Sequence, residues 1–307
     1  MMGDDRKMLF IVGDNPFHGI SHLSQEQARR RGNAMTFPEY AADLVETSLD
    51  NEANGFMFSV SETTLSILKA LQEKAPNRRP GLYALVPYAF EYVRLATHLG
   101  TTGLAKKFVK QITFSGNVRA VGMGLKGVLR MDPEALLKTY LLHEISRIKS
   151  AAGKQANLES LLLHEVITDM GLALNFDWLF KPYIEFMLKR GIKPGFNTRN
   201  FAYLVKKFNE WNINFRDVVI AAPFNKLGFQ MDPSKIECEK ALASLDGANV
   251  IAISILAAGY LKPPEAIEYV AGLPNISGVS VGVSKEQHAR ETFRLLKNGL
   301  NIQIAHC

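Results

Sequence analysis

Short apolar runs alternate along this chain with amphipathic stretches of helical period. Eight apolar runs are present, at residues 8–13, 55–60, 81–88, 158–165, 192–197, 217–225, 249–259 and 276–284. Several show no alternation of apolar and polar positions, as expected for parallel strands that are covered on both faces. The stretches between them often begin at Pro or Asp-Pro, which is typical of helix starts. Eight strands alternating with helices predict an α/β fold, specifically a (β/α)8 TIM barrel.

The length of 307 residues fits one such barrel, so we predict a single domain over residues 1–307. An open doubly wound sheet is the alternative, but no Gly-rich dinucleotide fingerprint follows an early strand. No apolar run is long enough to span a bilayer, and the start MMGDDRK has no secretory pattern. Two cysteines are too few for a disulfide framework or a thiolate metal cage. We therefore expect a cytoplasmic protein.

One stretch departs from the repeating pattern, a basic insertion at residues 91–130 that follows the third apolar run. Between Tyr92 and Met131 there are seven Lys and Arg and no acid, and the other 29 basic residues balance the 30 acids. Because the excess charge lies in one segment, we expect no nucleic-acid partner. An insertion on the catalytic face is typical of a lid or a specificity element, suited to an anionic ligand or an anionic membrane surface. A solvated excursion or a subunit contact is the alternative, and we expect a homo-oligomer.

The candidate catalytic residues follow the apolar runs, because barrel active sites lie at the carboxyl ends of the strands. The fourth run ends in His164-Glu165, and histidine exchanges protons near neutral pH. Neighbours on a strand point to opposite faces, so only one of the two faces the interior unless the strand has already ended. We predict His164 as the pocket residue, with a structural histidine as the alternative. The remaining candidate catalytic residues are Asp14, His18 and Tyr88.

Other strand ends supply polar side chains that we predict to bind substrate. These are Asn15, Ser59, Glu62, Asn197, Arg199, Asn225 and Lys226. Lys226 as an amine nucleophile is a less favoured alternative. Gly282, Ser284 and Lys285 precede a helix start, so their backbone N–H groups are predicted to hold a phosphate of a substrate or cofactor. Asp14, His18, Glu62, His164 and Glu165 lack a diagnostic metal-ligand spacing, so no metal is predicted.

Several segments of the second half then suggest a family. They are LESLLLHEVITD (158–169), FMLKRGIKPGFNTRNF (186–201), APFNKLGFQMDP (222–233), NVIAISILAAGYL (249–261) and ISGVSVGVSKEQHARETFRLL (276–296). In order and spacing they resemble the aldo-keto reductase superfamily over roughly residues 155–297. The resemblance implies a (β/α)8 barrel, a catalytic histidine at His164, and an NADP phosphate held near Gly282, Ser284 and Lys285.

The sequence departs from that family at the reacting centre. Ser59 stands where the resemblance calls for an Asp, the segment with the catalytic Tyr is absent, and the end of the third strand offers no Lys. The glutamine expected under the nicotinamide is replaced by Ala221 or Ala222. Tyr88 is a candidate substitute acid.

These observations predict a small-molecule enzyme that acts on a polar, anionic carbonyl compound at the carboxyl face of the barrel. The missing Tyr and Lys favour a redox-neutral lyase or isomerase reaction. An NADP-dependent oxidoreductase of aldo-keto reductase type is the first alternative. A barrel without catalysis, which binds an anionic ligand, a membrane or a partner through the insertion, is the second. Fold alone does not decide among them, because one barrel supports many chemistries.

Overall fold

The computed structural model describes residues 8–18, 37–87, 133–153 and 156–304. Tyr88 and the predicted insertion at 91–130 lie outside these residues, and so does any role given to them.

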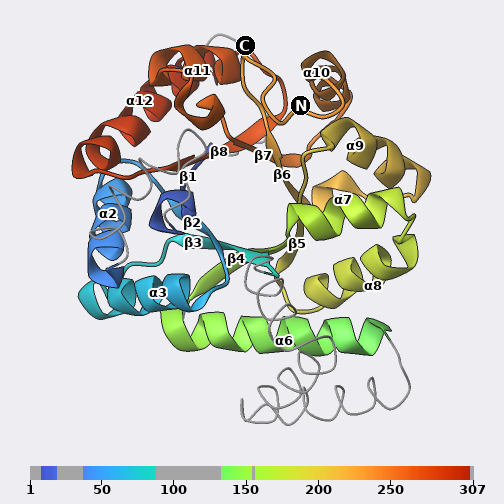
Figure 1. Ribbon diagram of the computed structural model, residues 1–307, viewed down its shortest axis with the longest axis horizontal. Helices are drawn as coiled ribbons and strands as arrows, with labels where there is room; N and C mark the ends of the chain where they lie inside the picture. The colour runs from blue at the N-terminus through green and yellow to red at the C-terminus, as the bar shows by residue number, and fades with distance from the viewer. Residues whose placement is uncertain (1–7, 19–36, 88–132, 154–155, 305–307) are drawn as a thin grey trace.

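Eight strands form a closed barrel in which each strand pairs in parallel with its neighbours in the sequence (Figure 1). Pairing of the first and last strands, with Leu9 opposite Gly278, closes the sheet. The strands are β1 (Leu9–Gly13), β2 (Gly55–Ser59), β3 (Gly81–Val86), β4 (Asn157–Leu163), β5 (Lys193–Asn197), β6 (Val219–Pro223), β7 (Asn249–Ile253) and β8 (Ile276–Gly282). All eight predicted strands are confirmed, and the open doubly wound sheet is excluded.

The helices surround this barrel and cover its outer face (Figure 1). The described α-helices are α2 (Pro38–Asp50), α3 (Glu62–Lys74), α6 (Pro133–Ala152), α7 (Glu165–Ala173), α8 (Asp177–Leu188), α9 (Phe201–Glu210), α10 (Lys235–Ala243), α11 (Pro263–Ala271) and α12 (Glu286–Ile304). Short 3-10 helices are η1 (Asn15–His18), η2 (Phe215–Asp217) and η3 (Ala257–Gly259). The connection from β4 to β5 holds two helices, α7 and α8, where the repeat requires only one.

Alternation along each strand divides the apolar residues into an inner and an outer core. Ile11, Met57, Leu162 and Ile251 belong to the small cluster inside the barrel. Their strand neighbours belong to the larger cluster between barrel and helices. The interior is narrow at β5, because a Cβ on Gly195 would lie only 2.4 Å from Leu162 Cγ. Packed side chains therefore fill the interior, and the carboxyl end of the barrel is left for chemistry.

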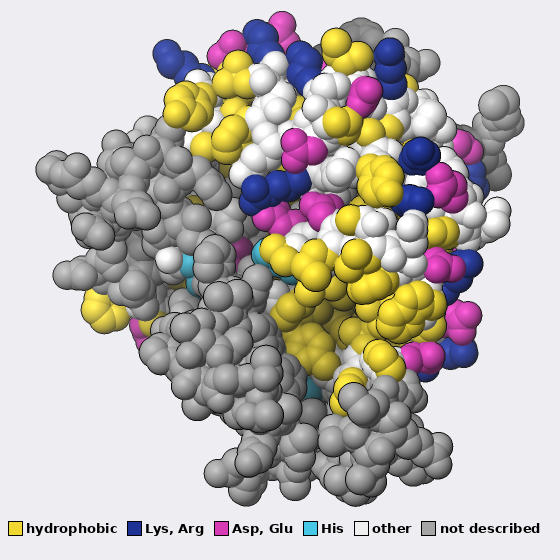
Figure 2. Space-filling model, turned by 45° about the vertical axis from the view of Figure 1, so that its right-hand side comes forward, with side chains coloured by type: hydrophobic (Ala, Val, Ile, Leu, Met, Phe, Trp, Pro, Cys, Tyr) yellow, Lys and Arg dark blue, Asp and Glu magenta, His cyan; other side chains and the backbone are white. Residues whose placement is uncertain are grey.

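Apolar side chains also gather on the outer face that carries α7 and α8 (Figure 2). Val166, Met170, Leu174 and Trp178 are each about half exposed there, at 47%, 52%, 56% and 49%. An exposed apolar surface of this kind is typical of a face that contacts another molecule. The homo-oligomer remains a prediction.

Candidate functional site

The carboxyl end of the barrel has a polar side and an apolar side. Since Met57, Leu162 and Gly195 face the interior, the residues two positions further on do so as well. These residues are Ser59, His164 and Asn197. On the opposite side the same rule gives Pro223 after Ala221 and Ile253 after Ile251. We call this end of the barrel the mouth.

The turn after β1 packs against the neighbouring strand ends and thereby fixes Asp14. Phe17 is 1% exposed and contacts Phe56, with ring centroids 6.2 Å apart. Pro16 lies on Gly282 so closely that a Cβ there would be 2.7 Å from the proline Cδ. The Phe17 N–H also donates to the Asp14 carbonyl at 2.8 Å. Close packing at the mouth therefore explains Pro16 in this turn and Gly282 at the end of β8.

Asp14 holds a buried carboxylate, and its hydrogen bonds join the first two strand ends. Its Oδ2 accepts the backbone N–H of Ser59 at 2.7 Å and lies 3.0 Å from His18 Nε2. The residue is 5% exposed. Within the described part of the chain, Oδ1 has no hydrogen-bond partner. One oxygen is thus fixed by the protein, and the other remains to accept a proton or a hydrogen bond from a ligand.

His164 is the residue between the end of β4 and the start of α7. Its Nδ1 accepts the N–H of Val166 at 3.3 Å and so caps the helix. Because Nδ1 is an acceptor, the neutral ring carries its proton on Nε2. Burial lowers the pKa of His164, the Arg199 guanidinium lowers it further, and the carboxylates of Glu165 and Asp14 oppose these effects. The ring is therefore a neutral donor within electrostatic range of Asp14.

The strand end at β5 is held to α7 by a carboxylate. Asp169 Oδ1 accepts the Thr198 hydroxyl, and Asp169 Oδ2 accepts the Arg199 N–H at 3.2 Å. The hydroxyl of Thr198 also accepts the Asn200 N–H at 2.9 Å. Burial raises the pKa of Asp169 although these bonds favour its ionised form. We call Asp169, Thr198 and Arg199 the β5 clasp; it fixes the position of Asn197.

Arg199 has a partner within the chain, and its role as a substrate ligand remains a prediction. Its guanidinium pairs with Glu165, and its side chain is 41% exposed. Adjacent to it, Asn197 points inward, is 6% exposed, and has an Oδ1 without a hydrogen-bond partner. Of the polar residues predicted at the end of β5, Asn197 is therefore the one placed in the mouth.

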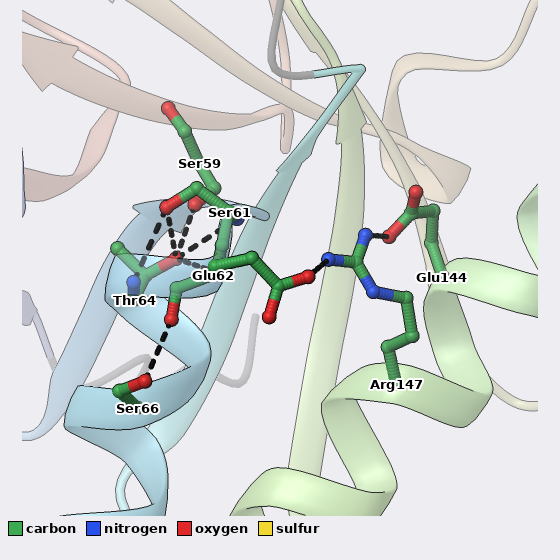
Figure 3. Close-up of polar contacts among 7 residues, drawn as sticks. All are labelled: Ser59, Ser61, Glu62, Thr64, Ser66, Glu144 and Arg147. Carbon is green, nitrogen blue, oxygen red and sulfur yellow. Dashed lines mark hydrogen bonds and ion pairs between the residues drawn. The ribbon is translucent and has the colours of Figure 1, made fainter. Parts of the chain in front are cut away.

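Glu62 and Ser59 are separated by the start of α3 (Figure 3). The Thr64 hydroxyl donates to the Ser59 carbonyl, and Ser61 caps the helix. Glu62 points outward, with a side chain 81% exposed, and accepts from Arg147 of α6 at 2.7 Å.

The same arginine donates to Glu144 at 2.9 Å (Figure 3). The side chain of Glu144 is 1% exposed, so Arg147 neutralises a buried carboxylate as well as an exposed one. Sequence reasoning missed this group, because Glu62 and Arg147 are 85 positions apart and no local pattern joins them. Glu62 thus has a structural partner outside the mouth.

Asn225 and Lys226 also have partners within the chain. The amide of the fully buried Asn225 donates to the Phe229 carbonyl and accepts the Phe229 N–H, both at 2.8 Å. Lys226 Nζ pairs with Glu265 at 3.2 Å on the surface. Asn15, at the start of η1, is exposed. Of these three predicted ligands, only Asn15 has a side chain without a bonded partner in the described structure.

The end of β8 is the predicted phosphate-binding turn. Gly282 is exposed despite its contact with Pro16, Ser284 is partly exposed, and Lys285 is exposed just before α12. Lys285 makes no ion pair with any described residue. The residues fit an NADP or substrate phosphate in their donor chemistry, and their role remains a prediction.

Other candidates for chemistry can be placed briefly. No group of three or more metal-ligating side chains occurs among the described residues. Burial raises the pKa of the Cys238 thiol to about 11, which makes it a poor nucleophile. A cavity of about 110 Å³ lies near the starts of β3 and β4, at the end of the barrel opposite the mouth. In the parts of the chain that are placed, no helix has the length and apolar character needed to cross a membrane.

Comparisons with known proteins agree with this fold. No protein-family model matches the sequence, and no curated protein matches it. Two solved structures, both of a proposed aldo-keto reductase from Pseudomonas aeruginosa, share the barrel with a TM-score of 0.56. They are 12% and 11% identical to this chain, and each match covers 95% of this chain and 90% of the other. The chain therefore shares the (β/α)8 barrel fold of these two structures.

Proposed function

We propose that this protein is an enzyme that moves a proton on a small, anionic carbonyl compound bound in the mouth. The observation that carries the proposal is that the half-fixed carboxylate of Asp14 lies within electrostatic range of the neutral ring of His164. A neutral imidazole N–H can polarise a carbonyl oxygen, and a held carboxylate can accept a proton. His18 and the Ser59 N–H keep Asp14 oriented by bonding its other oxygen.

In the proposed step, Asp14 Oδ1 takes a proton from the carbon beside the carbonyl. The electron pair of that C–H bond forms a C=C bond, and the carbonyl oxygen gains negative charge. His164 Nε2–H hydrogen-bonds that oxygen and can deliver its proton to it. Reversal of these transfers restores the substrate with its α-proton exchanged for one from solvent. Where the enol carries a hydroxyl on each carbon of the C=C bond, protonation of the former carbonyl carbon and loss of the other hydroxyl proton give the isomer without an external oxidant.

The test is proton exchange in D₂O followed by proton NMR. Small ketones and aldehydes that carry a phosphate or carboxylate should lose their α-proton signals in the presence of the protein. We expect Asp14→Asn and His164→Gln each to slow exchange at least a hundredfold, because one transfers the proton and the other stabilises the charge. Glu62→Gln, a carboxylate change outside the mouth, is the matched control and should exchange at the wild-type rate. Exchange at that rate in both mouth variants would refute the proposal.

A second candidate is NADP-dependent carbonyl reduction, favoured by the fold shared with proposed aldo-keto reductases. Here Asp14 would take the place of the missing Asp, because its carboxylate contacts the backbone of Ser59, the residue at that position. The cofactor would supply hydride, and Gly282, Ser284 and Lys285 would bind its phosphate. Titration with NADPH, followed by fluorescence quenching and calorimetry, tests this second function. Micromolar affinity that falls in Lys285→Ala supports carbonyl reduction, and no binding at millimolar concentration excludes it.

A further inference from the structure

His164 and Asn197 lie side by side at the mouth. Their strands β4 and β5 are paired in parallel with Leu163 opposite Phe196, so the two next residues also face one another. The flanking ladders reach the same level. The His164 N–H donates to the Val86 carbonyl of β3 at 2.8 Å, and the Thr198 N–H donates to the Ala221 carbonyl of β6 at 3.0 Å. Neighbouring strands are about 4.8 Å apart. The two inward side chains can therefore bind adjacent atoms of one ligand.

These two side chains offer complementary hydrogen-bonding groups. His164 presents a donor at Nε2, because its Nδ1 is occupied by the helix cap. Asn197 presents an acceptor, because its Oδ1 receives no hydrogen bond although the residue is 6% exposed. A buried acceptor left unpaired destabilises the protein, so such groups normally receive a partner. A simple ketone or aldehyde brings only acceptors to this pair and leaves the amide oxygen unpaired.

From this juxtaposition we propose that the substrate is an α-hydroxycarbonyl compound, whose carbonyl binds His164 and whose adjacent hydroxyl donates to Asn197 Oδ1. The inference rests on the proposed function and narrows its substrate class. The clasp supports this role, because Asp169 fixes Thr198 and Arg199, the two residues that follow Asn197. The amide thus stands on a strand end that cannot easily shift to find another donor.

The test uses two ligands that differ by one hydroxyl beside the carbonyl, dihydroxyacetone phosphate and hydroxyacetone phosphate. Calorimetry on the full-length protein should show at least tenfold tighter binding of the dihydroxy compound, since a site built for a hydroxyl discriminates against its absence. Asn197→Leu should remove this preference and leave the affinity for hydroxyacetone phosphate unchanged. Asn197→Asp keeps an acceptor and should retain the preference, which separates ligand recognition from a packing effect. His164→Gln should weaken both ligands by the same factor.

Asn51→Leu is the matched control, because Asn51 is a 4% exposed amide with an unpartnered Oδ1 at the far end of α2. That variant should keep the preference for the hydroxyl. Equal wild-type affinity for both ligands would overturn the substrate class and leave the proposed function standing. Failure of both ligands to bind would overturn both. Should Asn197→Leu not fold, as judged by circular dichroism, Asn197→Ala replaces it with the same expected loss of preference.

Discussion

Thr198→Val tests whether the β5 clasp holds the mouth together. Valine matches threonine in shape, so the change removes one hydroxyl from a fully buried position. Two hydrogen bonds are lost: the one donated to the Asp169 carboxylate and the one accepted from the Asn200 N–H at 2.9 Å. A bond to a charged group contributes about 1.5–3 kcal/mol and a neutral one about 0.5–1.5 kcal/mol. We expect the free energy of unfolding to fall by about 2–4 kcal/mol.

Equilibrium urea unfolding at pH 7, followed by circular dichroism, measures this difference. Ser66→Ala is the control, because its hydroxyl donates to a helix carbonyl at an exposed site and should matter by less than about 0.5 kcal/mol. The Thr198 bond favours ionised Asp169, so the loss is complete above the pKa of Asp169 and shrinks as that carboxyl becomes protonated. A loss below about 0.5 kcal/mol at pH 7, or one that grows on acidification, would refute this account of the clasp.

Three further predictions concern stability. Burial lowers the pKa of His164 below the ordinary value of about 6.5, so the unfolded chain binds the proton more tightly than the folded protein does. The free energy of unfolding, measured by urea titration, should therefore fall from pH 7 to pH 5. It should fall less in His164→Gln. Arg147→Met removes the guanidinium that neutralises the buried Glu144 carboxylate and should lower the free energy of unfolding by about 3–5 kcal/mol in the same assay. Glu62→Gln should lower it by less than about 1 kcal/mol. Gly282→Ala places a methyl group against the ring of Pro16 and should lower the free energy of unfolding by about 1–3 kcal/mol in thermal unfolding. Gly272→Ala should be nearly neutral, because a Cβ there would lie 3.5 Å from the nearest atom, the Tyr269 carbonyl oxygen.

The architecture could be predicted because each strand shows its own local signal. A run such as residues 8–13 has no polar side chain, as expected for a strand covered on both faces, and eight apolar runs define the barrel. The second helix between β4 and β5 was not predicted. Its stretch, residues 177–188, continues the apolar character of α7 without a Gly or Pro boundary strong enough to divide the two.

Candidate site residues could be predicted only as far as strand position determines them. His164 follows from the end of β4. The ambiguity with Glu165 is resolved because His164 keeps an extended backbone beyond Leu163, whereas Glu165 begins α7 and pairs with Arg199. The partners of Glu62 and Asn225 are set by tertiary packing and by a turn, which no residue pattern shows. The contact between Asp14 and the Ser59 backbone likewise depends on the pairing of β1 with β2.

The most direct test of the account is the protonation state of His164. Nitrogen-15 NMR of the imidazole rings distinguishes the two neutral tautomers and the charged ring, and His164→Gln assigns the signals. We expect a neutral ring at pH 7 with the proton on Nε2 and a pKa below that of a free histidine. A ring charged at pH 7, or one with its proton on Nδ1, would contradict the carbonyl-binding role on which the proposed chemistry depends.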